Sequence, residues 1–573
     1  MNIKLAKIIK MRVYLIVLAG IVSFAFLDAY PISILDEAKN AEAAREMLIS
    51  GDYWVPKFNG ELRTDKPPLH YYFMAIGFKL FGASVFGARF FSACMGLILL
   101  LATYRFAQDH MGEKVAKNTF FVLLSSFFFM QEFRLAVPDP YLITFVSLAL
   151  FQFYNYYKKR KYIHLLLFYA FLSLATLSKG PVAIALPGLS VFLFLVLNGE
   201  FKRVFDFYPI MGLLCILTLT APWFIQVHLL TDGLWTNGFF FQHNFDRFLS
   251  PMEGHGGIFL VTWGFVILGI LPFSFFIPQS LRTAWQQRKN STLLFALCII
   301  IVFILFFSVS STKLPNYTMP CYPFIALLLG YYIKQKQDMG IESWDLFSIS
   351  LLSILAIALP IVVYFVLSQD QSLFTFKNLA FTFIPTVVGT LVGLIFFFQK
   401  KIKQLIYMLI CSWGILVFIF NGFIFPSLTN TLPTTIVANK LTDKANIVVY
   451  KRMDAAFPFT FQSTFKVINT IDELRLYSGY YVLTNHPEGQ SLDEQIGIKK
   501  IVLSKLLILL NFLIVLICEI AFTPALITLD GFSYILFVND KKVISFSSSR
   551  YLVFSLNIGP ITILTPKLYN CFD

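Results

Sequence analysis

The chain has 573 residues, of which 57% are hydrophobic and only 14% are charged, and phenylalanine alone occurs 66 times. This composition excludes an ordinary soluble globular domain and indicates an integral membrane protein with many spans. The formal net charge of +14 must be assigned loop by loop in such a protein, so it is no argument for nucleic-acid binding. None of the seven cysteines forms a CxxC pair and most lie in apolar runs, which disfavours a disulfide framework or a thiolate metal site.

A membrane-spanning helix needs about 20 mostly apolar residues. About thirteen runs approach this requirement, so the predicted fold class is an all-α polytopic membrane protein. The first run is not typical of a cleaved signal peptide, because no small-residue cleavage site follows it. The runs lie near residues 13–27, 85–106, 115–130, 140–156, 164–177, 182–197, 209–227, 258–277, 293–309, 319–333, 346–367, 381–398 and 405–425.

Basic residues mark the N-terminus and then every second gap between the runs. By the positive-inside rule these gaps are cytoplasmic, so the N-terminus is predicted to be cytoplasmic and the alternate gaps extracytoplasmic. Two outer gaps, 28–84 and 228–257, are long and rich in charged and aromatic residues, so we expect the function on the outer face. The basic groups lie at residues 4–12, 105–117, 158–161, 202–203, 282–289, 334–336 and 400–403.

The chain is predicted to divide into three parts. Residues 1–426 form the transmembrane domain, with 28–84 as its first extracytoplasmic loop. Residues 427–500 are the one long polar stretch, in which strand-like "ANIVVYKRM" and "GYYVLTNH" and helix-like "TIDELRLYS" predict a small extracytoplasmic α/β domain. Residues 501–573, an apolar run followed by a tail, have no predicted role.

The first outer loop carries two charged blocks. Asp36 and Glu37 open "LDEAKNAEAAREM", whose pattern is that of a helix lying in the membrane interface. Asp65 and Lys66 precede two prolines that stiffen the chain where it re-enters the membrane. Taken singly, Asp36 could simply cap its helix and Lys66 could simply snorkel. Together with the later outer acids, they favour a site at the lipid boundary.

The later outer gaps add further charges. Arg134 and Asp139 stand at the outer start of a span, where an acid is costly unless it is paired or used, although a helix cap would also explain Asp139. Lys179 and Lys313 are basic residues in extracytoplasmic gaps, which otherwise hold few basic residues. They could contact a phosphate group. Alternatively, each could supply a favourable positive charge at a helix C-terminus. A further group could bind a divalent ion but matches no zinc signature: His243, Asp246, Arg247, Glu253 and His255.

These segments, in this order, resemble the GT-C membrane glycosyltransferases. The resemblance covers roughly residues 13–425 and is nearest to the bacterial enzymes that add 4-amino-4-deoxy-L-arabinose to lipid A, which are akin to the protein O-mannosyltransferases. As a set the motifs are specific for the superfamily. They give little information on which sugar is transferred and which acceptor receives it. They are "LDEAKNAEAAREML", "FNGELRTDKPPLHYY", "FRLAVPDPYLITFVSLAL", "LSKGPVAIALPG", "HNFDRF" followed by "HGG", and "STKLPNYTMPCYPF".

The resemblance implies a polyprenyl-phosphate sugar donor, an envelope acceptor such as a lipid A-type glycolipid, and inversion at the sugar carbon. The active site would face outward from the bacterial cytoplasmic membrane. Membrane lipids would be binding partners, and nucleic acid would not. Two alternatives remain open: an enzyme like the protein O-mannosyltransferases, and a polytopic lipid or sugar transporter. A transporter would more often carry charges or helix breaks at mid-membrane.

The resemblance also implies roles for particular residues. The catalytic carboxylate is Asp36, with Glu37 beside it, and Asp139 is a further site residue. A divalent metal (zinc, magnesium or manganese) would be held by Asp65 and His255. The donor phosphate would be contacted by Lys66, Lys39, Arg134, Lys179 and Lys313.

This chain departs from the family pattern at two of these positions. Lys39 stands where an arginine is usual, and a lysine keeps the charge but loses the planar fork that grips phosphate. Asp65 stands where a glutamate is common, and its shorter side chain weakens the case for a metal contact.

Overall fold

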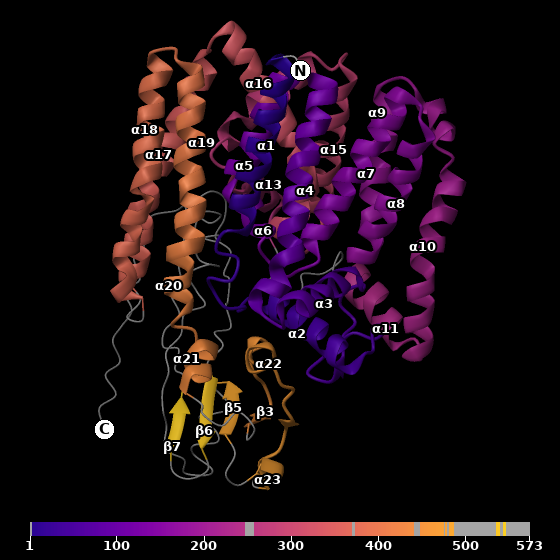
Figure 1. The fold of residues 1–573 in the computed structure, drawn as a ribbon, viewed down its shortest axis with the longest axis vertical. Coiled ribbons are helices and arrows are strands. Elements are labelled where there is room, and N and C mark those ends of the chain that lie inside the picture. The colour runs from indigo at the N-terminus through magenta and orange to yellow at the C-terminus, as the bar shows by residue number, and fades with distance from the viewer. Residues whose placement is uncertain are drawn as a thin grey trace.

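The computed structural model describes residues 3–246, 257–369, 373–440, 447–474, 476–477, 481–485, 534–538 and 542–545. Most of these residues are helical, and the long helices stand side by side with the N-terminus at one end of the bundle (Figure 1). Seven helices in the described ranges are long and apolar enough to cross a membrane: α4 (Val85–Met111), α8 (Tyr162–Lys179), α10 (Pro209–Leu230), α15 (Ser291–Val309), α17 (Ser343–Gln369), η5 with α18 (Phe374–Phe398) and α19 to α20 (Ile402–Thr429).

The expected multi-span helical architecture is therefore present, whereas the expected number of thirteen spans is not confirmed. An eighth crossing would combine α13 (Phe259–Gly269) with the helical segment Ser274–Gln286, and this pair is bent by 116°. The predicted run 115–130 is broken at Ser126, which has an extended backbone (φ −73°, ψ 104°) between α5 (Glu113–Ser125) and α6 (Phe127–Glu132). Other predicted runs form α1 (Ile3–Phe24), α7 (Asp139–Lys159), α9 (Val182–Leu197) and α16 (Tyr322–Met339), which follows the 3-10 helix η4 (Pro315–Cys321).

The first long loop folds at the end of the bundle away from the N-terminus (Figure 1). It contains α2 (Leu35–Ser50), the two-stranded hairpin of β1 (Lys57–Phe58) and β2 (Glu61–Leu62), and α3 (Leu69–Phe81). The alanines of α2 pack against Met74 and Phe78 of α3. The small side chains let the two helices approach closely, so protein buries much of α2, including several of its charged residues, although the sequence pattern predicts an interfacial helix.

A five-stranded sheet lies beyond α2 and α3 (Figure 1). Its order is β4 (Val467–Ile468), β3 (Ile447–Tyr450), β5 (Tyr481–Asn485), β6 (Tyr534–Val538) and β7 (Lys542–Ser545), with β3 parallel to β4 and β5 and the other pairs antiparallel. Two strands thus come from beyond residue 500, while the domain limits 427 and 500 themselves stay a prediction. Helix α22 (Ala456–Phe461) joins the two parts, because Phe457 and Phe461 pack on the sheet and Phe459 packs in the cluster of α2 and α3.

Candidate active site

Asp36 and Asn40 lie one turn apart on α2 and therefore share a face of the helix. Asp36 is exposed and Asn40 is fully buried. Asn40 Oδ1 accepts a hydrogen bond from Arg63 Nη2 at 2.9 Å and lies 3.3 Å from His70 Nε2. The buried amide thereby fixes Arg63 and His70 beneath the face of α2 that carries Asp36.

Arg63 is a buried guanidinium in the loop before α3. Its side chain is held on one side by Asn40 and by Asp65, whose Oδ2 lies 3.2 Å from Nη2. Its Nε and Nη1 atoms are buried and have no hydrogen-bond partner among the described residues. A guanidinium with two open donors suits a phosphate or a carboxylate. The sequence analysis missed this residue, although an arginine two positions before the Asp–Lys pair was a usable signal.

Asp65 is held as a carboxylate by its neighbours. Its Oδ1 lies 3.1 Å from His243 Nε2, opposite the contact to Arg63. Burial opposes ionisation, but the hydrogen bond from His243 and the charges of Arg63, His243 and Lys66 outweigh it and hold the pKa of Asp65 well below its usual range. The structure therefore brings His243 to Asp65, and the predicted second metal ligand, His255, lies outside the described residues.

Lys66 and Lys179 come from different parts of the chain and act on the same buried histidine. Burial, together with the charges of Arg63, Lys66 and Lys179, lowers the pKa of His70 well below its ordinary value, so this imidazole is neutral at pH 7. Lys66 itself is only 7% exposed. The charges of three cations thus act on one buried imidazole, and Lys66 and Lys179 are among the predicted phosphate contacts.

Asp139 and Lys179 form an ion pair between the N-terminus of α7 and the C-terminus of α8. Lys179 Nζ lies 2.5 Å from Asp139 Oδ1 and 4.9 Å from the centre of the Tyr317 ring. Each charge also suits its own helix end, but Asp139 does not cap α7, whose N-cap residue is Pro138 and which has no side-chain capping hydrogen bond.

Glu132, at the end of α6, is the second site residue that the sequence analysis missed. Its carboxyl group is 6% exposed, and its Oε1 atom has no hydrogen-bond partner among the described residues. Burial and the negative charges of Asp139 and Asp36 raise its pKa to about 8, against the lowering effects of Lys179 and of a hydrogen bond from Asn316. A carboxyl group of this kind carries its proton at neutral pH.

Glu37 does not share the position of Asp36, although the sequence analysis grouped the two as catalytic. Its side chain is fully buried, and Arg89 of α4 binds both of its oxygens, at 2.7 and 2.9 Å. The backbone N–H of Ala136 also donates to it, at 2.9 Å. Arg89 in turn donates to the carbonyls of Leu27 and Tyr30. This saturated ion pair ties α2 to α4 and to the end of the first helix, which is a structural role.

Removing one partner of this pair should destabilise the fold strongly. We expect Glu37→Ala to lower the free energy of unfolding by about 3–5 kcal/mol, because it leaves the Arg89 charge buried and unpaired. The double variant Glu37→Leu with Arg89→Leu should recover much of the loss, since neither charge then remains. Thermal unfolding of the purified protein measures both effects, and equal losses in the single and double variants would contradict this role for the pair.

Three predicted phosphate contacts have other surroundings. Arg134 is buried and donates to the carbonyls of Val22, Ser23 and Ala25 at the end of α1, so its phosphate role stays a prediction. Lys313 is buried and donates to the carbonyl of Ser310 at 2.6 Å. Lys39 is half-buried in α2. In sequence, an arginine that donates to backbone carbonyls at a helix end has the same signature as one that binds a ligand.

A divalent metal would need several ligands close together. The described residues contain no group of three His, Cys, Asp or Glu side chains placed to hold an ion. Asp65 has one histidine beside it, and the guanidinium of Arg63 competes for its other oxygen. These residues do not by themselves make a metal site, so no chemical step is assigned to a metal.

Comparison with known proteins gives the chain its relatives. The family model described as dolichyl-phosphate-mannose-protein mannosyltransferase matches residues 65–225. An uncharacterized protein of Aquifex aeolicus is 28% identical over 72% of this chain and 77% of its own length. The undecaprenyl phosphate-α-4-amino-4-deoxy-L-arabinose arabinosyl transferase 1 of Proteus mirabilis is 31% identical over 53% of this chain, and the match spans 56% of that protein.

The fold has a solved counterpart. The crystal structure of ArnT from Cupriavidus metallidurans bound to undecaprenyl phosphate superimposes with a TM-score of 0.72, covering 85% of this chain and 95% of that one at 21% identity. At this identity the likeness establishes the shared fold. The chain thus has the fold of ArnT and is similar in sequence, over part of its length, to the aminoarabinose transferases and the protein mannosyltransferases.

Proposed function

We propose that this enzyme transfers a sugar from a polyprenyl-phosphate donor to a lipid A-type glycolipid on the extracytoplasmic face of the bacterial inner membrane. The observation that carries the proposal is the cationic cradle below Asp36. It consists of Arg63, with two open donors, and of Lys66 and Lys179, whose charges act on the same buried His70. Arg63 and Lys66 are buried, and Lys179 is half-buried and paired with Asp139. Cations in such surroundings suit a phosphate group, and a long lipid suits the apolar bundle.

In this mechanism Asp36 is the general base and the cradle holds the leaving phosphate. Asp36 accepts the proton of the acceptor oxygen as that oxygen attacks the anomeric carbon. The bond between the anomeric carbon and the phosphate oxygen breaks with its electron pair passing to the phosphate, where Arg63 and Lys66 stabilise the added charge. Attack from the face opposite the phosphate inverts the configuration at the anomeric carbon.

The sugar and its lipid carrier are taken from the named relatives, and the glycolipid acceptor is the one that the family resemblance implies. The Proteus enzyme is named for an undecaprenyl phosphate-linked 4-amino-4-deoxy-L-arabinose, and the Cupriavidus protein was crystallised with undecaprenyl phosphate. The mannosyltransferase description of the matched family model favours a second candidate, transfer of a hexose to a protein.

A panel of donors and acceptors tests the proposal. Purified protein in vesicles is given labelled polyprenyl-phosphate aminopentose or polyprenyl-phosphate hexose, with lipid A or a serine- and threonine-rich peptide as acceptor. We expect label on lipid A from the aminopentose donor. Label on the peptide from the hexose donor would establish the second candidate, and no transfer in any combination would contradict both.

The predicted sidedness can be checked by cysteine labelling. In a chain whose seven native cysteines are replaced, a membrane-impermeant maleimide added from outside should label Glu61→Cys in the β1–β2 hairpin. It should leave Lys161→Cys unlabelled, because that residue lies in a basic loop that the positive-inside rule assigns to the cytoplasm. Both positions are exposed in the fold. Labelling of Lys161→Cys from outside would reverse the topology and move the site to the other face.

The raised pKa of Glu132 predicts a pH dependence of donor binding. Glu132 is protonated below about pH 8 and ionises above it, which adds a second negative charge beside Asp139 and competes for Lys179. Donor affinity should therefore fall as the pH rises through about 8. Three further groups interact with Glu132 besides Asp139 and Lys179. They are Asp36, Asn316 and Tyr322.

Two variants test whether Glu132 causes the fall in donor affinity, because they change the pH at which the fall occurs in different ways. Glu132→Gln should bind the donor at pH 7 and lose the fall in affinity between pH 7 and 9. Asn316→Ala removes a hydrogen bond that lowers the pKa of Glu132, so the fall should move to higher pH. Titration of donor binding measures both, and a Glu132→Gln profile identical to that of the wild type would show that another group titrates.

A further inference from the structure

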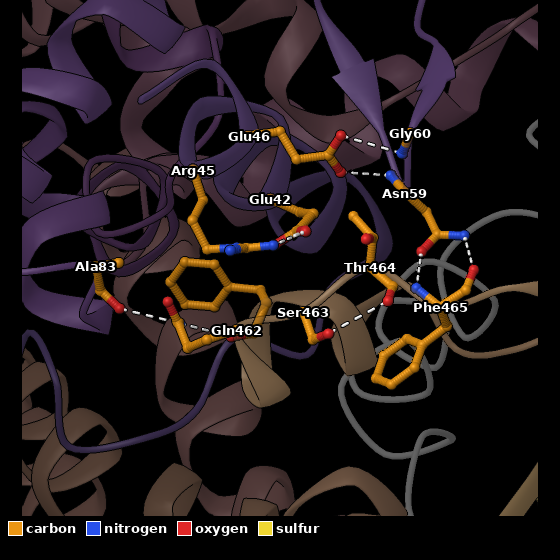
Figure 2. A network of polar contacts seen from close by, with 11 residues as sticks. Glu42, Arg45, Glu46, Asn59, Gly60, Ala83, Gln462, Ser463, Thr464 and Phe465 are labelled. Carbon is orange, nitrogen blue, oxygen red and sulfur yellow. Dashed lines mark hydrogen bonds and ion pairs between the residues drawn. The ribbon is translucent and has the colours of Figure 1, made fainter. Parts of the chain in front are cut away.

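A cavity of about 390 Å³ lies between the second half of α2 and the chain that follows α22. Arg45, Glu46 and Ile49 line it from α2, and Gln462 to Thr464 line it from the opposite side. Figure 2 shows these two walls facing each other, with the hairpin of β1 and β2 beside them. The candidate active site described above does not include any of these residues.

The two walls are fixed relative to each other. The side-chain amide of Asn59 donates to the carbonyl of Phe465 at 2.9 Å and accepts from its N–H at 2.7 Å (Figure 2). Gln462 Nε2 donates to the carbonyl of Ala83 at 3.1 Å. The Glu46 carboxylate holds the hairpin turn through the N–H groups of Asn59 and Gly60, at 2.6 and 3.0 Å. The cavity is therefore preformed, which lowers the entropic cost of binding a ligand there.

The charges at the cavity are balanced from within the protein. Arg45 makes a bidentate pair with Glu42, at 2.7 and 2.6 Å, and both side chains are buried. The Glu46 carboxylate accepts hydrogen bonds from two backbone N–H groups. The Nζ atom of Lys57 lies 3.9 Å from Oδ2 of Asp52. A strongly charged ligand would thus gain little, because each ionic group already has a counterpart.

The rest of the lining combines short polar groups with apolar carbon. Ser50, Ser463 and Thr464 supply hydroxyl groups, while Met47, Ile49 and Val55 supply apolar surface. Hydroxyl groups both donate and accept hydrogen bonds. Seven of the ten lining residues are polar or charged and three are apolar, so the surface suits a ligand rich in hydrogen-bonding groups, and the volume lies in the usual range for a small-molecule site. A neutral sugar, with hydroxyl edges and C–H faces, matches this surface.

The position on α2 connects the cavity with the reaction. Arg45 to Ser50 follow Asp36 on the same helix, about 14–21 Å along its axis at 1.5 Å per residue. We propose that the cavity is an acceptor subsite that binds a neutral saccharide unit of the glycolipid headgroup, remote from the oxygen that reacts at Asp36. The proposal rests on the proposed function, and binding energy from a remote part of a substrate serves to position its reacting end.

The test fills the cavity and compares two acceptors. Ser463→Trp should raise KM at least fivefold for lipid A that carries a neutral core oligosaccharide. It should leave KM for lipid A alone, and the donor Kd, unchanged. The matched control is Asn469→Trp, an exposed position outside the cavity lining, which should change none of the three. An unchanged KM for the longer acceptor, or an equal rise for both acceptors, would overturn the subsite.

A binding experiment separates this proposal from the proposed function. Equilibrium dialysis of the wild-type protein with the labelled free core oligosaccharide requires no transfer. We expect saturable binding to the wild type and to Asn469→Trp, and at least fivefold weaker binding to Ser463→Trp. Equal binding to all three proteins would overturn the subsite even if transfer is observed. Selective binding without transfer to any acceptor would retain the subsite and refute the proposed function.

Discussion

Replacing Asp36 with asparagine should give a folded protein that still binds the donor but transfers sugar at least ~100-fold more slowly, the low end for a positioned acid–base group. The N-cap residue of α2 is Ile34 and no side chain caps the helix, so replacing Asp36 with an isosteric asparagine should let α2 begin as before. The substitution removes the negative charge and the basicity from the exposed first turn of α2. Turnover at saturating donor, with donor Kd measured separately, distinguishes a lost base from a lost binding contact.

The control for this variant must be chosen with the structure in view. Glu37→Gln is unsuitable, because Glu37 is bound to Arg89 and its loss would disturb the fold. Glu61→Gln is the matched control, since Glu61 is an exposed carboxylate in β2 of the same loop, and its turnover should be near normal. Near-normal turnover in donor-bound Asp36→Asn would contradict the assignment of the base.

Lys66→Ala should weaken donor binding by roughly 2–5 kcal/mol, the range for truncating one member of a buried charge pair. Lys66 is almost fully buried, so water cannot replace its charge opposite the donor phosphate. Lys66→Arg should keep part of the affinity, because the charge stays while the geometry of the head group changes. Direct titration with polyprenyl phosphate measures the loss without requiring transfer.

Lys79→Ala is the control for Lys66, because Lys79 is an exposed lysine of α3 away from the cradle. Its donor affinity should match the wild type. Full affinity in Lys66→Ala would place the donor phosphate elsewhere, and Arg63 and Lys179 would be the next residues to replace.

The sequence predicted the helical class and the segments that build the site because both depend on local patterns. Apolar runs and the alternation of basic gaps are readable along the chain. The expected number of thirteen spans is not confirmed, and a run of apolar residues does not by itself reveal a break. Ser126 ends α5, and the 116° bend near residues 270–273 divides another run, although the residues around each break are mostly apolar.

The roles of neighbouring charges could not be separated along the sequence. Asp36 and Glu37 are adjacent, yet a rotation of about 100° per residue on a helix turns Glu37 toward Arg89 and leaves Asp36 exposed. Arg63 and Glu132 were missed because their importance lies in burial and in unpartnered atoms, which only the packed structure reveals. A divalent ion at Asp65 and His255 stays a prediction.

The most direct test of the account is the coupling of donor cleavage to acceptor glycosylation in the purified enzyme. Vesicles that contain the protein, a labelled polyprenyl-phosphate aminopentose and lipid A are analysed by mass spectrometry over time. We predict one free polyprenyl phosphate for each sugar added to lipid A, with inverted configuration at the anomeric carbon and no release without acceptor. Intact donor in the presence of lipid A, or sugar released to water in place of transfer, would contradict the account.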